Sequence, residues 1–291
     1  MTGSSEARAA ASAPPARLLT VLVALGALTG LGALGCEPPP PKTGLGYTAD
    51  AKASYERAVD QVKDRNFMEA RRGLQEVRRR YGYSKYARLA ELRLADIDFE
   101  EDKLAEAARA YRQFVHDHRS DSEEVAYARA KVAESEYRQI SDSFLTPAPT
   151  QRDQAAVQGA YRELRGYLQD YPSAAESPRL RTLLAEVTRL LVEHELYVAR
   201  FYLRRDNYEA AVARLLYALR AYARENEDLV DHRLHDLAEP EVIVLLGETY
   251  LKMHRWADAK EAFQLLSQRD PTSPYVEQAG RYLEYLKKRG V

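Results

Sequence analysis

The chain has 291 residues, 30% of them charged, and a formal net charge of −1. A net charge this close to zero excludes a strong overall attraction to nucleic acid. The single cysteine excludes a disulfide framework and a cysteine-rich metal site.

Residues 1–35 have the pattern of an export signal. Arg8 and Arg17 precede a nearly charge-free apolar stretch, Leu18 to Gly35, and Cys36 follows directly. Small residues before a cysteine resemble the lipobox of bacterial lipoproteins. That resemblance implies cleavage before Cys36, a diacylglycerol on its thiol and an acyl chain such as palmitate on its new amino group. We expect no cofactor besides this lipid. The alternative is an uncleaved membrane anchor, for which the stretch is just long enough.

Residues 36–48 are rich in proline and glycine, which predicts an extended tether. Residues 49–291 are dominated by alanine, leucine, glutamate and arginine, which favour helices. Prolines fall between the helical stretches, and one long helix is predicted from about Pro178 to Arg205.

A spacing pattern recurs along this helical part. Each set begins with a residue that is large and apolar or that is tolerated in place of one. A small residue follows three positions later, and a bulky residue follows seven positions after the first. The five sets are Phe67, Ala70, Leu74; Leu104, Ala107, Tyr111; Gln154, Val157, Tyr161; Tyr208, Ala211, Leu215; and Trp256, Ala259, Phe263. Small residues let antiparallel helices approach closely, and bulky residues fill the space between successive pairs.

This spacing resembles tetratricopeptide repeats. We therefore expect an all-α superhelical solenoid of about five irregular helical hairpins. The predicted units are residues 49–84, 85–121, 122–174, 175–226 and 239–291, and a capping helix is expected at Tyr275–Lys288. Tight turns are predicted within the hairpins at residues 64–66, 101–103, 205–207 and 253–255.

The sequence contains no strong candidate for a nucleotide-binding, metal or catalytic site. A G-x-G-x-x-G pattern at Gly30–Gly35 lies in the export signal and lacks the strand and helix of a nucleotide fold. His232 and His235 could share a helical face, but further metal ligands are missing, so a solvated loop is favoured. No nucleophile or buried acid–base pair is evident. We expect a protein that is not an enzyme.

Residues 65–93 carry nine basic and three acidic side chains. The favoured interpretation is a solvated outer face. The alternative is a contact with a polypeptide or with lipid headgroups near the anchor.

Three stretches carry a resemblance to a known family. They are Tyr55–Ala70, Arg152–Ser173 and, as the best match, Glu195–Arg214. With the lipobox cysteine and the short tether before them, they resemble the BamD family. These are lipoproteins of the β-barrel assembly machinery in Gram-negative outer membranes.

The resemblance implies a scaffold anchored by lipid to the outer membrane and facing the periplasm. Its N-terminal units would receive unfolded outer-membrane proteins. Its C-terminal units would dock on a POTRA domain of a BamA-like barrel subunit, and further lipoproteins of the complex could join. Arg214 matches a family arginine near that dock, and its alternative is a solvated, outward-facing arginine. Rival functions are another periplasmic tetratricopeptide lipoprotein, such as a pilus or secretion pilotin or a cell-envelope coordinator, and an envelope enzyme built on the repeat.

Overall fold

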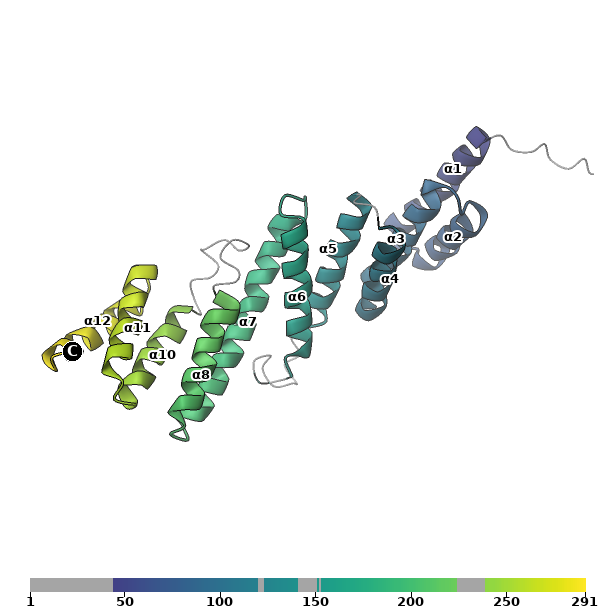
Figure 1. Cartoon of the computed structure of the whole chain (residues 1–291). Helices are drawn as coiled ribbons and strands as arrows, with labels where there is room; N and C mark the ends of the chain where they lie inside the picture. Colours follow the sequence, from purple (N-terminus) through teal and green to yellow (C-terminus); the bar gives the residue numbers. More distant parts are fainter. Residues whose placement is uncertain (1–43, 120–122, 141–150, 152, 224–238) are drawn as a thin grey trace, which may run out of the picture. The chain divides into compact units, whose positions relative to one another are not determined.

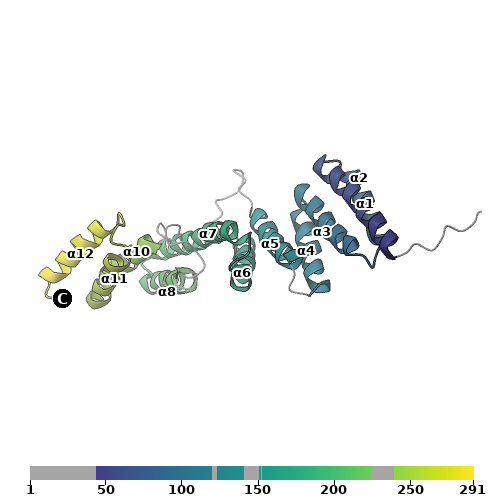
Figure 2. The same cartoon turned by 90° about the horizontal axis from the view of Figure 1, so that it is seen from above.

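The computed structural model describes residues 44–119, 123–140, 151, 153–223 and 239–291 (Figures 1 and 2). The described residues form helices and turns and contain no strand. The helices are α1 (Gly44–Lys63), α2 (Phe67–Arg80), α3 (Lys85–Glu100), α4 (Leu104–Asp117), α5 (Glu123–Arg138), α6 (Ala155–Asp170), α7 (Ser177–Leu203), α8 (Tyr208–Ala218), the π-helix η2 (Leu219–Ala223), α10 (Glu239–Lys252), α11 (Trp256–Arg269) and α12 (Val276–Lys288).

Each helix packs against the helix before it and the helix after it along the chain. The pairs are α1 with α2, α3 with α4, α5 with α6, α7 with α8, and α10 with α11, and α12 packs on α11. The first helix of each pair also contacts the first helix of the next pair. This is the predicted all-α arrangement of helical hairpins, which is confirmed.

The repeated small and bulky residues form the contacts between these helices. The small positions are almost fully buried: Ala70, Ala107, Val157, Ala211 and Ala259. The bulky positions seven residues after the start of each set are buried as well: Leu74, Tyr111, Tyr161, Leu215 and Phe263. Burying a side chain of this size contributes about 1.5–3 kcal/mol, so the repeated spacing accounts for much of the core.

Four of the hairpin turns have the same backbone geometry. The middle residue of each turn lies in the left-handed region, with φ between 54° and 61°; these residues are Arg65, Asp102, Asp206 and His254. In each turn the next N–H donates to the carbonyl five residues earlier, as in Asn66 to Gln61 at 2.9 Å. This helix ending is a Schellman motif, whose backbone hydrogen bonds satisfy the last carbonyls of the first helix. The tight turns predicted at these four places are confirmed.

The beginning of α1 differs from the prediction. The tether was expected to extend to residue 48, but α1 begins at Gly44. Two contacts stabilise this extra turn: the Thr48 hydroxyl donates to the carbonyl of Gly44 at 3.0 Å, and the Tyr47 ring packs edge-on against Tyr81 at 5.3 Å. The aromatic contact with α2 favours helix where the local composition favoured an extended chain.

Candidate protein-binding groove

A groove crosses the first helices of the first three pairs. Its volume is about 500 Å³, and we call it the N-terminal groove. The walls come from α1, α3 and α5, and one end comes from the turn after α1 and the start of α2. The lining residues are Tyr55, Val59, Val62, Lys63, Arg65, Phe67, Arg93, Asp96, Phe99, Glu100, Tyr127 and Lys131. On each helix they recur three or four residues apart, which places them on one face.

Asp96 is a buried carboxylate at the centre of this lining, with 8% of its surface exposed. It accepts hydrogen bonds from the Tyr111 hydroxyl at 2.6 Å and the Tyr127 hydroxyl at 3.0 Å, and it forms an ion pair with Arg93. Burial, together with the charge of Asp96, raises the pKa of both tyrosines, so they stay neutral and donate. This network connects α3, α4 and α5.

Aromatic rings contact three of the four cations of the groove, Arg65, Arg93 and Lys131. The Lys131 ammonium lies 4.1 Å from the centre of the Phe99 ring and also bonds Glu134 at 3.1 Å. The Arg93 guanidinium donates to the Tyr55 hydroxyl at 3.4 Å. Such cation–ring contacts contribute about 0.5–2 kcal/mol each, which keeps the charges in place.

The lining therefore offers more hydrogen-bond donors than acceptors. Lys63, Arg65, Arg93 and Lys131 are cationic. Three of them already pair with acids, which are Asp60, Asp96 and Glu134, but an ammonium carries three N–H donors and a guanidinium five, so donors remain. An extended peptide exposes backbone carbonyls that can accept from such donors, while aromatic faces can cover its side chains. The geometry suits recognition of an extended polypeptide.

Arg214 lies on α8 with 45% of its side chain exposed. Its Nη1 atom donates to Oε2 of Glu195 on α7 at 3.3 Å, and the side chain of Glu195 is only 6% exposed. The guanidinium is therefore paired within the hairpin and is also open to solvent on one side. Its contact with a partner stays a prediction.

A sequence model of the YfiO family, described as outer membrane lipoprotein, matches residues 48–241. The match spans two thirds of the chain, from α1 to the beginning of α10. The chain belongs to the YfiO family of outer membrane lipoproteins.

Relatives of the chain bear the name of an assembly factor. It is 22% identical over 227 residues to the outer membrane protein assembly factor BamD of Neisseria gonorrhoeae, covering 77% of this chain and 81% of that protein. It is 25% identical over 229 residues to BamD of Caulobacter vibrioides, covering 79% of this chain and 69% of that protein. The resemblance to the BamD family is confirmed, and a YfiO-family protein of this kind is not an enzyme.

Solved structures of tetratricopeptide proteins are also similar at low identity. One from Thermus thermophilus is 16% identical with a TM-score of 0.34, covering 80% of this chain and 98% of that chain. Pseudomonas aeruginosa PilF is 16% identical with a TM-score of 0.34, covering 84% of this chain and 88% of that chain.

The structure describes only some of the other residues that the sequence analysis singled out. Cys36 and the pair His232 and His235 lie outside the described residues. Among the helices that the structure describes, none has the length and apolar character needed to cross a bilayer. In the same described part, no three metal-ligating side chains come together.

The basic stretch of residues 65–93 divides into two kinds of side chain. Arg72 and Arg79 are exposed and pair with Glu69 and Glu76 on their own helix, as expected for a solvated face. Arg71 is less exposed. It forms ion pairs with Asp98 on α3 at 2.9 Å and with Glu101, directly after the end of α3, at 2.6 Å. Arg65 and Arg93 instead line the N-terminal groove.

The sequence did not single out the residues of this groove. One signal was present: Asp96 stands between Ala95 and Ile97, which are both buried. A carboxylate at such a position needs partners, because an unpaired buried charge is costly. The identity of those partners depends on how α4 and α5 pack on α3.

Proposed function

We propose that this protein is a lipid-anchored scaffold of the outer-membrane β-barrel assembly machinery. The observation that carries the proposal is the YfiO family match over residues 48–241, together with relatives named as BamD. In this proposal the lipid on Cys36 holds the protein at the outer membrane, facing the periplasm. Two acyl signals anchor a protein stably where one chain gives only marginal binding.

The N-terminal groove is the proposed site for unfolded outer-membrane proteins. Its cationic donors and aromatic rings match the exposed backbone and alternating apolar side chains of a strand that has not yet paired. The chain also holds a BamA-like barrel subunit through a POTRA domain, with Arg214 contributing to that contact, and other lipoproteins of the complex join it.

Two experiments test this function. Affinity purification of the full-length lipoprotein from membranes should co-purify a large β-barrel protein with POTRA domains. Depletion of the lipoprotein should lower the abundance of many outer-membrane barrel proteins together, as measured by quantitative proteomics. Co-purification of a secretin, or an unchanged barrel profile, would instead indicate a pilotin-type lipoprotein.

The groove has its own test. Reversing Lys63 and Arg65 to glutamate should weaken binding of a labelled peptide from an outer-membrane barrel strand by about 2- to 30-fold, since each lost charged contact costs about 0.2–1 kcal/mol near the surface. Arg72→Glu, which reverses an exposed charge on α2 outside the groove, is the matched control. Equal losses for both proteins would contradict the proposed site.

A further inference from the structure

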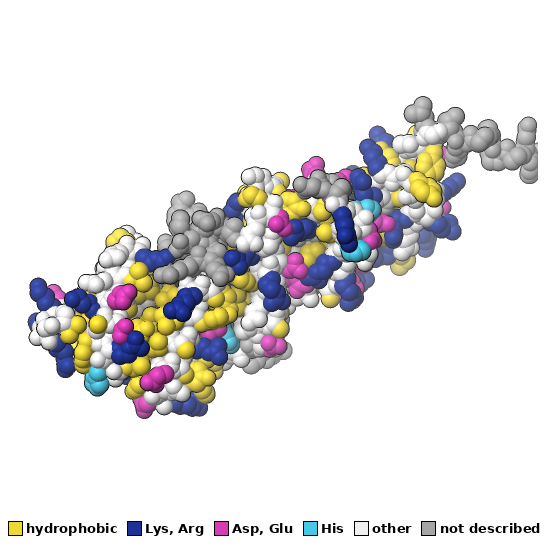
Figure 3. Space-filling model, viewed as in Figure 1, with side chains coloured by type: hydrophobic (Ala, Val, Ile, Leu, Met, Phe, Trp, Pro, Cys, Tyr) yellow, Lys and Arg dark blue, Asp and Glu magenta, His cyan; other side chains and the backbone are white. Residues whose placement is uncertain are grey.

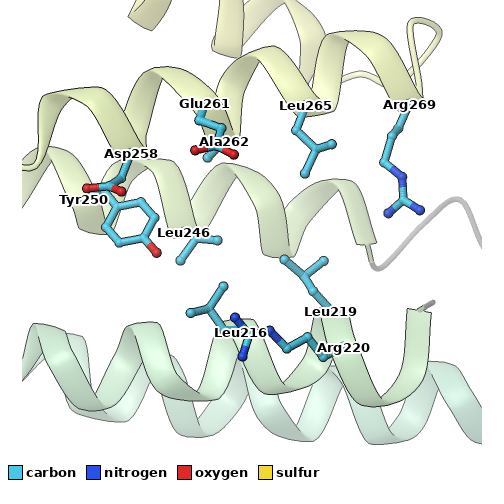
Figure 4. A pocket seen from close by; sticks show the side chains of 10 residues that line it. All are labelled: Leu216, Leu219, Arg220, Leu246, Tyr250, Asp258, Glu261, Ala262, Leu265 and Arg269. Carbon is cyan, nitrogen blue, oxygen red and sulfur yellow. The ribbon is translucent and has the colours of Figure 1, made fainter. Parts of the chain in front are cut away.

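A second groove lies between the last two helical pairs. It has a volume of about 250 Å³, and we call it the C-terminal groove. Figure 4 shows α8 and η2 on one side, α11 on the other and α10 between them. Both α8 and α11 pack on α10, so α10 forms the floor.

Half of the residues that line this groove are apolar. Leu216 and Leu219 come from α8 and η2, Leu246 from the floor, and Ala262 and Leu265 from α11. Figure 3 shows hydrophobic side chains gathered on the surface where α8, α10 and α11 meet. A patch of this kind, with charged residues at its edges, is typical of a protein contact surface.

Two charges of opposite sign line the groove without a hydrogen bond or ion pair to other described residues. Arg220 projects from η2, and Glu261 projects from α11 on the other side (Figure 4). Both side chains are exposed. Asp258 differs from them, because it accepts a hydrogen bond from Arg255 at 2.8 Å. A ligand that brings one acid and one base would complement both free charges.

The secondary structure of that ligand can be inferred from the helices that form the walls of the C-terminal groove. The walls and floor are helices, whose backbone groups are bonded internally, so they cannot pair with the edge of an incoming strand. Five of the ten residues that line this groove are apolar, compared with four of the twelve that line the N-terminal groove, so a smaller share of the lining could bond an extended backbone. An α-helix satisfies its own backbone and can lay a row of side chains between two parallel ridges.

We propose that the C-terminal groove binds an amphipathic α-helix of a partner protein. The apolar face of that helix covers Leu216, Leu219 and Leu265, an acidic residue pairs with Arg220, and a basic residue pairs with Glu261. The proposal goes beyond the assembly function, because it assigns a site and a ligand class that stand on this geometry alone.

Designed peptides provide the probe. The first is a helix of 14 residues, the length of α11, with leucines at i, i+3, i+4 and i+7 and one glutamate and one lysine beside them. The second has the same composition with leucines spread around the helix. The third carries a central proline that breaks the helix. Binding to the full-length lipoprotein in detergent is measured by fluorescence anisotropy.

We expect only the first peptide to bind and Leu219→Glu to weaken its binding at least tenfold. Arg220→Glu should weaken it as well, and a peptide with lysine in place of the glutamate should restore the affinity. Because Arg220 is exposed, this second variant should fold normally, which a thermal melt checks. Arg204→Glu, an exposed reversal outside the groove, is the control and should leave binding unchanged.

Several outcomes would overturn the proposal. They are absence of binding by the first peptide, equal binding of the proline peptide, and failure of the charge exchange to restore affinity. Self-association that Leu219→Glu abolishes would identify a second copy of this chain as the occupant instead. The N-terminal variant Lys63→Glu should not alter peptide binding here, which separates this test from the test of client binding.

Discussion

The contact between Gly247 and Phe263 allows a sharp test of how the last hairpin is packed. Gly247 lies on α10, and a Cβ atom added there would stand 2.5 Å from Cε1 and 2.6 Å from Cζ of the Phe263 ring. Phe263 on α11 is fully buried, and its ring also stacks on Tyr282, with 4.9 Å between the ring centres. The ring therefore has little space into which it could move.

We expect Gly247→Ala to destabilise the protein. Overpacking a filled core costs about 1–3 kcal/mol. Alanine regains about 1 kcal/mol of helix propensity over glycine. A contact as short as 2.5 Å puts the overpacking cost in the upper part of its range, about 2–3 kcal/mol, so the net loss is about 1–2 kcal/mol and the melting temperature falls by roughly 2–8 °C for a domain of this size.

Gly280→Ala is the matched control. Gly280 also lies within a helix, α12, but no neighbouring atom stands within 4 Å of an added Cβ. This substitution should stabilise the protein by about 0.5–1 kcal/mol through helix propensity alone. Circular dichroism melts of residues 37–291 measure both effects.

A second substitution locates the cause. In Gly247→Ala combined with Phe263→Leu, the smaller side chain makes room for the new methyl group, so the two effects should not add. If Gly247→Ala is as stable as the parent protein, or if the double variant is simply additive, the close approach of α10 and α11 is wrong.

Three further predictions concern buried and processed groups. Glu134 is buried beside cations. Burial raises the pKa of its carboxyl group, but hydrogen bonds from Arg179 and the charge of Lys131 lower this pKa overall. The ionised carboxylate therefore stabilises the folded protein at neutral pH, and this stabilisation is lost as pH falls below about 4. Glu134→Gln should lower the urea midpoint at pH 7 by more than it does in acid, whereas Glu284→Gln, at an exposed position within α12, should change neither midpoint. Tyr111→Phe removes a donor to Asp96 and should cost about 1–2 kcal/mol with an unchanged urea slope; no loss would contradict the Asp96 network. Cys36→Ala should abolish incorporation of radiolabelled palmitate and leave a longer, uncleaved chain on a gel; a labelled variant would place the lipid elsewhere.

The helical hairpins could be predicted from the sequence because their determinants are local. The spacing of Ala70 to Leu74 and of Ala259 to Phe263 marks helix faces that must meet a neighbour, and both sets are buried. The four tight turns have a similar local origin, since each closes with bonds that span only a few residues.

The two grooves could not be predicted in this way. Asp96 accepts hydrogen bonds from Tyr111 on α4 and Tyr127 on α5, and the carboxylate of Glu134 pairs with Arg179, which lies 45 residues further along the chain. The sequence by itself determined which residues form helices and which faces are buried, because the 3.6-residue period and the turn chemistry act over a few residues. Only the tertiary structure decided which charges and rings share a groove, because that depends on how successive helices pack, and no short-range pattern encodes it.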